Sequence, residues 1–225
     1  MSYPFSGPME LPAPSVAQHH IALSSPTNFS GQMVVGDGPG RVVLTNSHLE
    51  LDWSMVLIAR SDTANIFEQV EFNWLDGDGN VHPHYFDFVI KQTDGLLIAY
   101  AVRPTGRSHG TFNKVMPVIA KQALASRVYA DVRHLSEDDL DPIDLSNAWL
   151  LHGMRTPDPE ADMLAAAVLT QMSGVETLGT LSDRVQQGAW GFRALIRLIR
   201  SHHLRLVRFE RIDMATEVYK AENVQ

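Results

Sequence analysis

Hydrophobic and polar positions in the first half of the chain predict one helix followed by a strand meander. Apolar residues recur at helical spacing after Ser47, and Glu50 follows Ser47 at the spacing of a helix-capping box. The apolar face of this helix consists of Leu49, Trp53, Val56 and Leu57. Three strand-like runs come next, separated by Asp-Gly turns. They span 66–74, 81–90 and 96–103.

Helical periodicity dominates the rest of the chain. The expected helices span 116–129, 145–152, 158–172, 178–187 and 190–201. Further strands are expected at 41–44, 130–132 and 204–211. Residues 1–40 are rich in Pro, Ser and Gly, which predicts an extended arm. The order of elements predicts an α/β protein in three parts: the arm over 1–40, an α/β core over 41–140 and a mainly helical module over 141–225.

Composition and charge narrow the class of protein. The chain is 44% hydrophobic and 20% charged, as a folded domain is, and it contains no cysteine for a disulfide or a thiolate metal site. Its start lacks the pattern of a signal peptide, and no apolar run reaches the roughly 18–20 residues of a membrane span, so we expect a cytoplasmic protein without membrane contact. A net charge of −8 argues against autonomous DNA binding.

A single carboxylate stands in the apolar strand around Asp87. Burial of such a group is costly unless it is paired, protonated or bound to a metal ion. If 93–95 form a three-residue hairpin loop with Gly95 in the left-handed position, Asp87 faces Ala101 on the next strand. Arg103 then lies on the same face as Ala101, because strand side chains alternate. The alternative is an aspartate at the end of a strand that pairs with the backbone or an arginine.

These residues resemble a known nuclease pattern. The segments that carry the resemblance are Ser47-His-Leu-Glu50, Glu68-Gln-Val-Glu-Phe72, His84-Tyr-Phe-Asp-Phe88 and Ala101-Val-Arg-Pro104. In order and spacing they are similar to the PD-(D/E)xK catalytic domain of the TnsA endonuclease subunit of heteromeric bacterial transposases. The resemblance covers about half of the chain and implies a restriction-endonuclease-like mixed sheet flanked by helices. A small, mainly helical winged-helix-like domain is expected to follow it.

The resemblance also implies a Mg²⁺-dependent site for DNA cleavage. Glu50 and Asp87 would be the metal ligands, and Arg103 would stand where the family has a catalytic lysine. Two positions depart from the pattern: Ala101 has no ligand atom, and the Arg103 guanidinium stays protonated and cannot act as a base. An arginine can still stabilise negative charge. The capping box alone also explains Glu50.

Arginines near the C-terminus suggest a DNA-binding surface. Arg193, Arg197 and Arg200 recur on one face of an expected helix, and helix, turn, helix and strand is the order of a winged helix. The residues expected to contact DNA are Arg107, Arg193, Arg197, Arg200, Arg205 and Arg208. An amphipathic helix with a solvated charged face is the plain alternative. In the resembled family this module also contacts a partner ATPase.

Three functions remain open from the sequence. The first is a TnsA-like DNA-binding or assembly component of a transposition system, with a decayed nuclease centre and other transposition proteins as partners. The second is a working Mg²⁺-dependent DNA endonuclease, so whether the chain is an enzyme stays open. The third is a protein-interaction or regulatory factor on the same scaffold. His82 and His84 could bind zinc, but no third or fourth ligand accompanies them.

Overall fold

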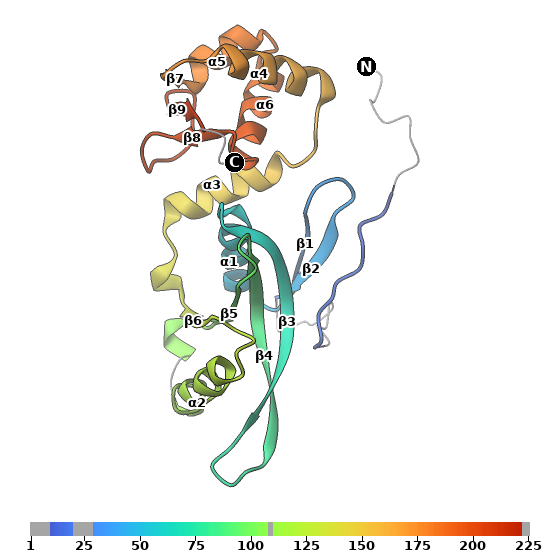
Figure 1. Cartoon of the computed structure of the whole chain (residues 1–225), viewed down its shortest axis with the longest axis vertical. Coiled ribbons are helices and arrows are strands. Elements are labelled where there is room, and N and C mark those ends of the chain that lie inside the picture. Colours follow the sequence, from blue (N-terminus) through green and yellow to red (C-terminus); the bar gives the residue numbers. More distant parts are fainter. Residues whose placement is uncertain (1–9, 20–28, 108–109, 222–225) are drawn as a thin grey trace. The chain divides into compact units, whose positions relative to one another are not determined.

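The protein is a mixed α/β molecule that divides into two compact units (Figure 1). A computed structural model describes residues 10–19, 29–107 and 110–221. Unit 1 comprises 1–51 and 64–137, and unit 2 comprises 52–63 and 138–225. Within the described ranges there are helices α1–α6, none of which is both long and apolar enough to cross a membrane.

A four-stranded mixed sheet forms the centre of unit 1, with the strand order β3-β4-β5-β6. β4 and β5 pair antiparallel, whereas β5 and β6 pair parallel. A parallel pair needs a crossover connection, and helix α2 lies in that connection. The bounds are β3 Thr63–Leu75, β4 Val81–Gln92, β5 Leu97–Val102, α2 Thr111–Ala125 and β6 Asp131–Leu135.

The hairpin between β4 and β5 has the register that the sequence predicts. Phe88 pairs with Tyr100 and Lys91 with Leu97, so the same register sets Asp87 opposite Ala101. The turn closes as Gly95 donates to the carbonyl of Gln92, and Gly95 has a φ of 91°. A side chain at that position would be strained, because left-handed backbone favours glycine. The predicted loop geometry and register are therefore confirmed.

The expectation of an extended arm is wrong for its last part. Residues 31–35 form β1 (Gly31–Val35), which pairs antiparallel with β2 (Arg41–Thr45). Alternate β1 side chains, Met33 and Val35 among them, are buried, which stabilises a strand where composition alone indicates a loop. Residues 10–19 are largely extended, and Ala13 bridges to Arg41. The rest of the arm, 1–9 and 20–28, lies outside the described residues.

Helix α2 is displaced from its expected position. It begins at Thr111 and ends at Ala125, whereas the pattern predicted 116–129. Its buried residues Met116, Ile119 and Ala123 pack with Phe86 and other residues of the sheet. The first turn before Met116 is more exposed, so an apolar pattern does not reveal it. Arg127, with a φ of 60°, lies just after the helix in the turn that leads to β6.

Unit 2 combines helices with a small antiparallel sheet of order β7-β9-β8. The last part of α1 (His48–Ala59) belongs to this unit. Its other helices are α3 Pro142–Gly153, α4 Pro159–Gln171, α5 Leu178–Val185 and α6 Ala189–Arg200. Its strands are β7 Val175–Thr177, β8 Leu204–Leu206 and β9 Glu217–Lys220.

Sequence patterns located the helices of unit 2 more accurately than its strands. The expected helix over 178–187 is α5, whose N-cap is Thr177, and the Thr177 hydroxyl accepts from the backbone amide of Thr180. The strand expected over 204–211 ends at Leu206. β7 and β9 were not predicted, because strands of three or four residues hold too few positions for a periodic pattern.

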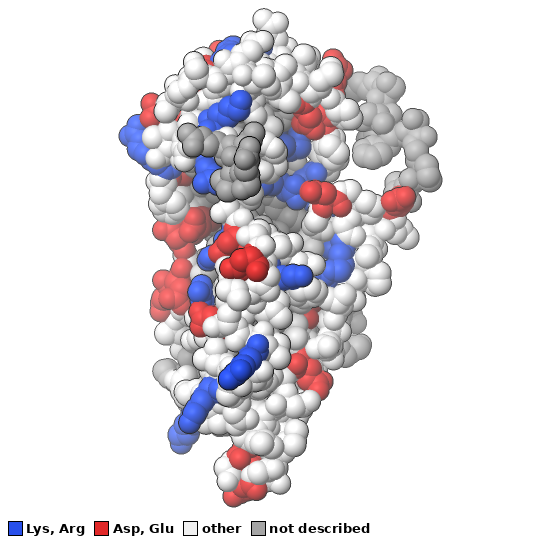
Figure 2. All heavy atoms as spheres, in the orientation of Figure 1, with Lys and Arg blue, Asp and Glu red and all other residues white. Residues whose placement is uncertain are grey.

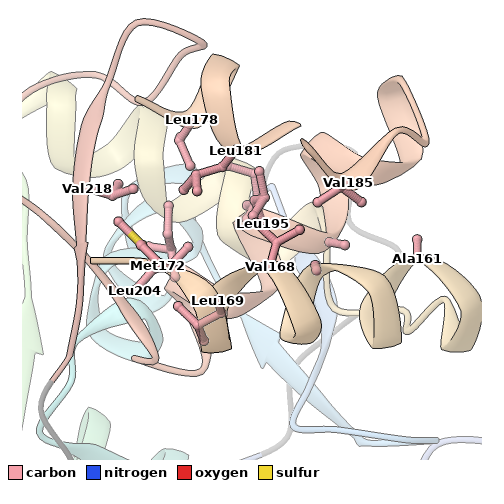
Figure 3. Packing of buried hydrophobic residues seen from close by; sticks show 14 of the residues in the cluster. Ala161, Val168, Leu169, Met172, Leu178, Leu181, Val185, Leu195, Leu204 and Val218 are labelled. Carbon is pink, nitrogen blue, oxygen red and sulfur yellow. The ribbon is translucent and has the colours of Figure 1, made fainter. Parts of the chain in front are cut away.

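The core of unit 2 lies between α4, α5, α6 and the small sheet (Figure 3). Val168 and Leu169 of α4 pack with Leu181 of α5, Leu195 of α6 and residues of β8 and β9. Helices α5 and α6 approach closely at Gly191. A Cβ atom there would lie 3.0 Å from Val185, so a larger residue would force the two helices apart.

Candidate functional site

Glu50 lies in the first turn of α1 and is 3% exposed. The Ser47 hydroxyl accepts from the Glu50 amide and donates to its carboxylate, at 3.1 and 3.0 Å. The backbone N–H of Asn46 donates to the other carboxylate oxygen of Glu50 at 2.8 Å. The capping role expected for Ser47 and Glu50 is thus confirmed, and it anchors the carboxylate in one orientation inside unit 1.

Asp87 lies in the middle of β4 and is 5% exposed. One of its oxygens accepts from the amide of Val102 at 2.7 Å, and the other accepts from the side chain of Gln69 at 3.2 Å. The Val102 amide thus bonds to a side chain, while the next amide, Arg103, donates to the carbonyl of Leu135 on β6. Asp87 therefore bonds to the last residue of β5, the strand that lies between β4 and β6.

Burial raises the pKa of both carboxylates. Burial and, after it, the charge of the neighbouring Asp87 together raise the pKa of Glu50 to about 7. Burial also raises the pKa of Asp87, whereas the positive charge of Arg103 and the hydrogen bond from Val102 oppose the increase. The positive charge of Arg103 opposes the rise in pKa at both Glu50 and Asp87. The structure thus brings together the three residues that the sequence predicts as catalytic.

Gln69 belongs to a segment that carries the nuclease resemblance, but no pattern in the sequence places its side chain at the site. It lies in β3, is 3% exposed, and its backbone has a φ of 50°. Phe67 and Val70, three positions apart in this strand, both pack against the core cluster around Phe86. A strand normally alternates, and such a local break is a β-bulge. Sequence periodicity cannot locate a bulge, because the extra residue changes the phase of the pattern.

His84 precedes Asp87 on β4, and its ring contacts Phe86 edge-on, with the ring centroids 4.9 Å apart. Burial lowers the pKa of His84 to about 4, and the charge of Arg103 contributes to this, so the ring is neutral at physiological pH. Its Nε2 atom is buried and has no hydrogen-bond partner. His82, the other histidine of this strand, contacts Asp76 at 2.8 Å in the β3–β4 turn. The two histidines therefore lie in different environments: His82 bonds to a carboxylate in an exposed turn, whereas the Nε2 atom of His84 is buried without a partner.

A shallow cavity of about 280 Å³ lies between α2 and β6, beside this site. Phe112 and His134 line it, with ring centroids 5.3 Å apart. The Arg103 guanidinium, whose charge opposes the effect of burial on the pKa of Asp87, lies 5.6 Å from the centre of the Phe112 ring. Arg103 is thus the residue that connects this cavity with the carboxylate pair.

The donor atoms at the site suit a hard divalent cation. Within the ranges that the structure describes, no three His, Cys, Asp or Glu side chains gather as a metal-binding group. Glu50 and Asp87 offer carboxylate oxygens, and Gln69 offers an amide. Mg²⁺ prefers oxygen ligands and retains several water molecules, so two carboxylates with an amide fit it.

The C-terminal arginines occupy different environments within unit 2. Arg197 is 13% exposed at its side chain and pairs with Asp162 of α4 at 2.6 Å, while Arg208 pairs with Glu217 at 2.7 Å. Arg193 is exposed beside Trp190, its guanidinium 5.1 Å from the ring centre. Arg200 of α6 is half-buried and Arg205 of β8 is exposed, whereas the side chain of Arg107 lies outside the described residues. Basic and acidic side chains are interspersed on the face in Figure 2.

Comparison with known proteins assigns no role to these residues. No protein-family model matches the chain, and no curated protein matches it either. What the site can do therefore follows from its own groups: two buried carboxylates that can hold protons or a cation, and a permanent positive charge at Arg103.

Proposed function

We propose that this protein is a TnsA-like, DNA-associated assembly component of a transposition system whose nuclease centre has lost cleavage activity. The observation that carries the proposal is the buried pair of Glu50 and Asp87, with Arg103 close to both. A restriction-endonuclease-like nuclease needs this pair on a helix and a strand, together with a carboxylate-x-lysine on the paired strand. Here that strand has Ala101 and Arg103.

Each substitution removes one part of the cleavage chemistry. A bound Mg²⁺ would neutralise charge on a DNA phosphate, and Glu50 and Asp87 would hold it. Ala101 contributes no side-chain donor. Arg103 stabilises negative charge but cannot move a proton, because its guanidinium stays protonated. Loss of one such group typically costs several kcal/mol of transition-state stabilisation, about a hundredfold to a thousandfold in rate.

The element order of unit 2 supports a winged-helix-like module. Helix α4, strand β7, helices α5 and α6, and strands β8 and β9 follow one another, and the sheet has the order β7-β9-β8. Only three residues, 186–188, separate α5 from α6, which is the connection of a helix-turn-helix. The exposed Arg193 and Arg205 would then contact phosphates, and Trp190 offers an exposed aromatic surface.

The net charge of −8 supports an assembly with partners. Phosphate contacts dominate DNA affinity, so a chain with this charge holds DNA weakly on its own. Proteins of the same transposition system would carry the larger share of the affinity. A cytoplasmic location belongs to the same proposal.

A working Mg²⁺-dependent endonuclease is the second candidate, and Gln69 favours it. An amide beside Asp87 partly compensates for Ala101. A purely protein-binding factor is the third candidate. It draws support from the ion pairs that occupy Arg197 and Arg208.

A cleavage assay separates the first two candidates. Supercoiled and linear DNA are incubated with the wild-type protein, Asp87→Ala and the exposed-turn control Asp94→Ala, in Mg²⁺ and in Mn²⁺. We expect intact DNA in every reaction. Cleavage by the wild type and by Asp94→Ala that disappears in Asp87→Ala would establish an active nuclease and refute a decayed centre.

A further inference from the structure

We propose that Gln69 takes the place of the side chain that residue 101 lacks: it positions Asp87 and acts as the third oxygen donor for a divalent cation at the Glu50–Asp87 pair. This inference rests on the proposed function, because the cation belongs to the nuclease-like centre. It predicts that the centre retains cation binding even though Arg103 does not support cleavage.

The β-bulge is what directs Gln69 to the site. Phe67 and Val70 both pack against the core cluster around Phe86, although side chains on one face of a regular strand recur every two positions. Glu68 bonds to Arg41, whereas Gln69 bonds to Asp87. Bulges redirect side chains in this way next to active sites.

The surrounding structure holds Gln69 in its unfavourable backbone conformation. A φ of 50° is rare for a residue with a side chain and is retained only where neighbouring contacts enforce it. The backbone carbonyl of Gln69 accepts from the backbone N–H of Gln18 at 3.1 Å. The side-chain oxygen of Gln18 accepts from the backbone N–H of Glu71 at 2.6 Å. The segment 10–19 therefore fixes the bulge from outside the sheet.

The amide of Gln69 has the chemistry that the site needs. Its Nε2 donates to Asp87 at 3.2 Å, which orients the carboxylate. The same amide carries an oxygen acceptor, and amide oxygens bind hard cations as carboxylates do. Ala101, opposite Asp87, contributes only a methyl group. A glycine at position 69 would remove the strain of the left-handed backbone conformation. It would also remove the amide that donates to Asp87 and the amide oxygen that would bind the cation.

Isothermal titration of the full chain with Mn²⁺ tests this assignment. We expect one site in the wild type, at least about tenfold weaker binding in Gln69→Gly, and at least about tenfold tighter binding in Gln69→Glu. Gln122→Ala is the matched control, because Gln122 bonds to the backbone of Leu75 in the same unit and makes no contact with Asp87. Its Mn²⁺ affinity should equal that of the wild type.

Thermal unfolding with and without Mn²⁺ distinguishes a donor from a merely structural residue. Gln69→Glu adds a third carboxylate, so it should lower the Tm in EDTA and show a larger rise in Tm with Mn²⁺ than the wild type. No Mn²⁺ binding by the wild type, or equal affinities in the wild type, Gln69→Gly and Gln69→Glu, would overturn the inference.

DNA binding in EDTA, which the proposed function assigns to unit 2, should be the same in the wild type and in all Gln69 variants. If the wild type does not bind DNA, the proposed function is rejected, whatever the Mn²⁺ result.

Discussion

At the scale of single residues, one side chain serves both the fold and the site. Glu50 closes the capping box of α1 through Ser47 and Asn46, and it also lies beside Asp87. The capping motif can be read from the sequence. The pairing with Asp87 is implied only by the nuclease resemblance, whereas the Asp-Gly turn predicts the hairpin register that sets Asp87 opposite Ala101. Gln69 could not be inferred, because a left-handed bulge residue leaves no periodic signal.

Glu50→Gln should change the pH dependence of stability. The pKa of Glu50 is about 7 in the folded state and near 4.5 when unperturbed, so the folded protein binds a proton more tightly than the unfolded chain. Wild-type stability therefore falls as pH rises from 4.5 to 7. Glutamine carries no charge, so the variant should gain at most about 3 kcal/mol relative to wild type at pH 8 and little at pH 4.5.

Urea unfolding at the two pH values measures this difference. Asp94→Asn, in the exposed β4–β5 turn, is a control in which one acid is also neutralised. An equal effect of Glu50→Gln at both pH values would mean that the Glu50 carboxyl titrates normally and is not perturbed by burial.

At the scale of elements, a single buried carboxylate, Glu68 of β3, attaches the N-terminal segment 10–19 to unit 1. Glu68, fully buried, accepts from Ser15 at 2.5 Å, from the Val16 amide at 3.1 Å and from Arg41 at 2.8 Å. Arg41 also donates to the carbonyl of Ile66. Composition predicts an unstructured arm here because proline and serine dominate it. Long-range partners such as Glu68 lie some 50 positions away in the sequence, so no local pattern reveals them.

Arg41→Met should destabilise unit 1 strongly. The substitution leaves the Glu68 carboxylate buried without its cation, and breaking a buried ion pair typically costs about 3–5 kcal/mol. The control is Arg133→Met, which breaks the exposed pair with Asp131 in the same unit and should cost about 1 kcal/mol or less. Urea unfolding followed by tryptophan fluorescence compares them. Equal losses would show that the buried pair does not anchor the segment.

At the scale of the whole molecule, two units carry different parts of the proposed function. Unit 1 holds the carboxylate centre, and unit 2 holds the exposed arginines. The sequence predicted the mixed α/β character and most helices, because those elements are long and periodic. It did not predict that residues 52–63 group with unit 2, since that depends on tertiary contacts. Nor did it predict that Arg197 is paired with Asp162 and only 13% exposed, which leaves Arg193 and Arg205 as better DNA contacts.

The most direct test of a DNA-associated component is the fluorescence anisotropy of a labelled duplex, titrated with protein in EDTA at increasing salt. Wild type should bind, and more weakly as salt rises, because phosphate contacts release counterions. Arg193→Glu with Arg205→Glu should lose at least about tenfold in affinity, whereas the charge-matched control, Arg133→Glu with Arg184→Glu, should lose much less. Equal losses in both double variants, or no binding by wild type at low salt, would contradict the account.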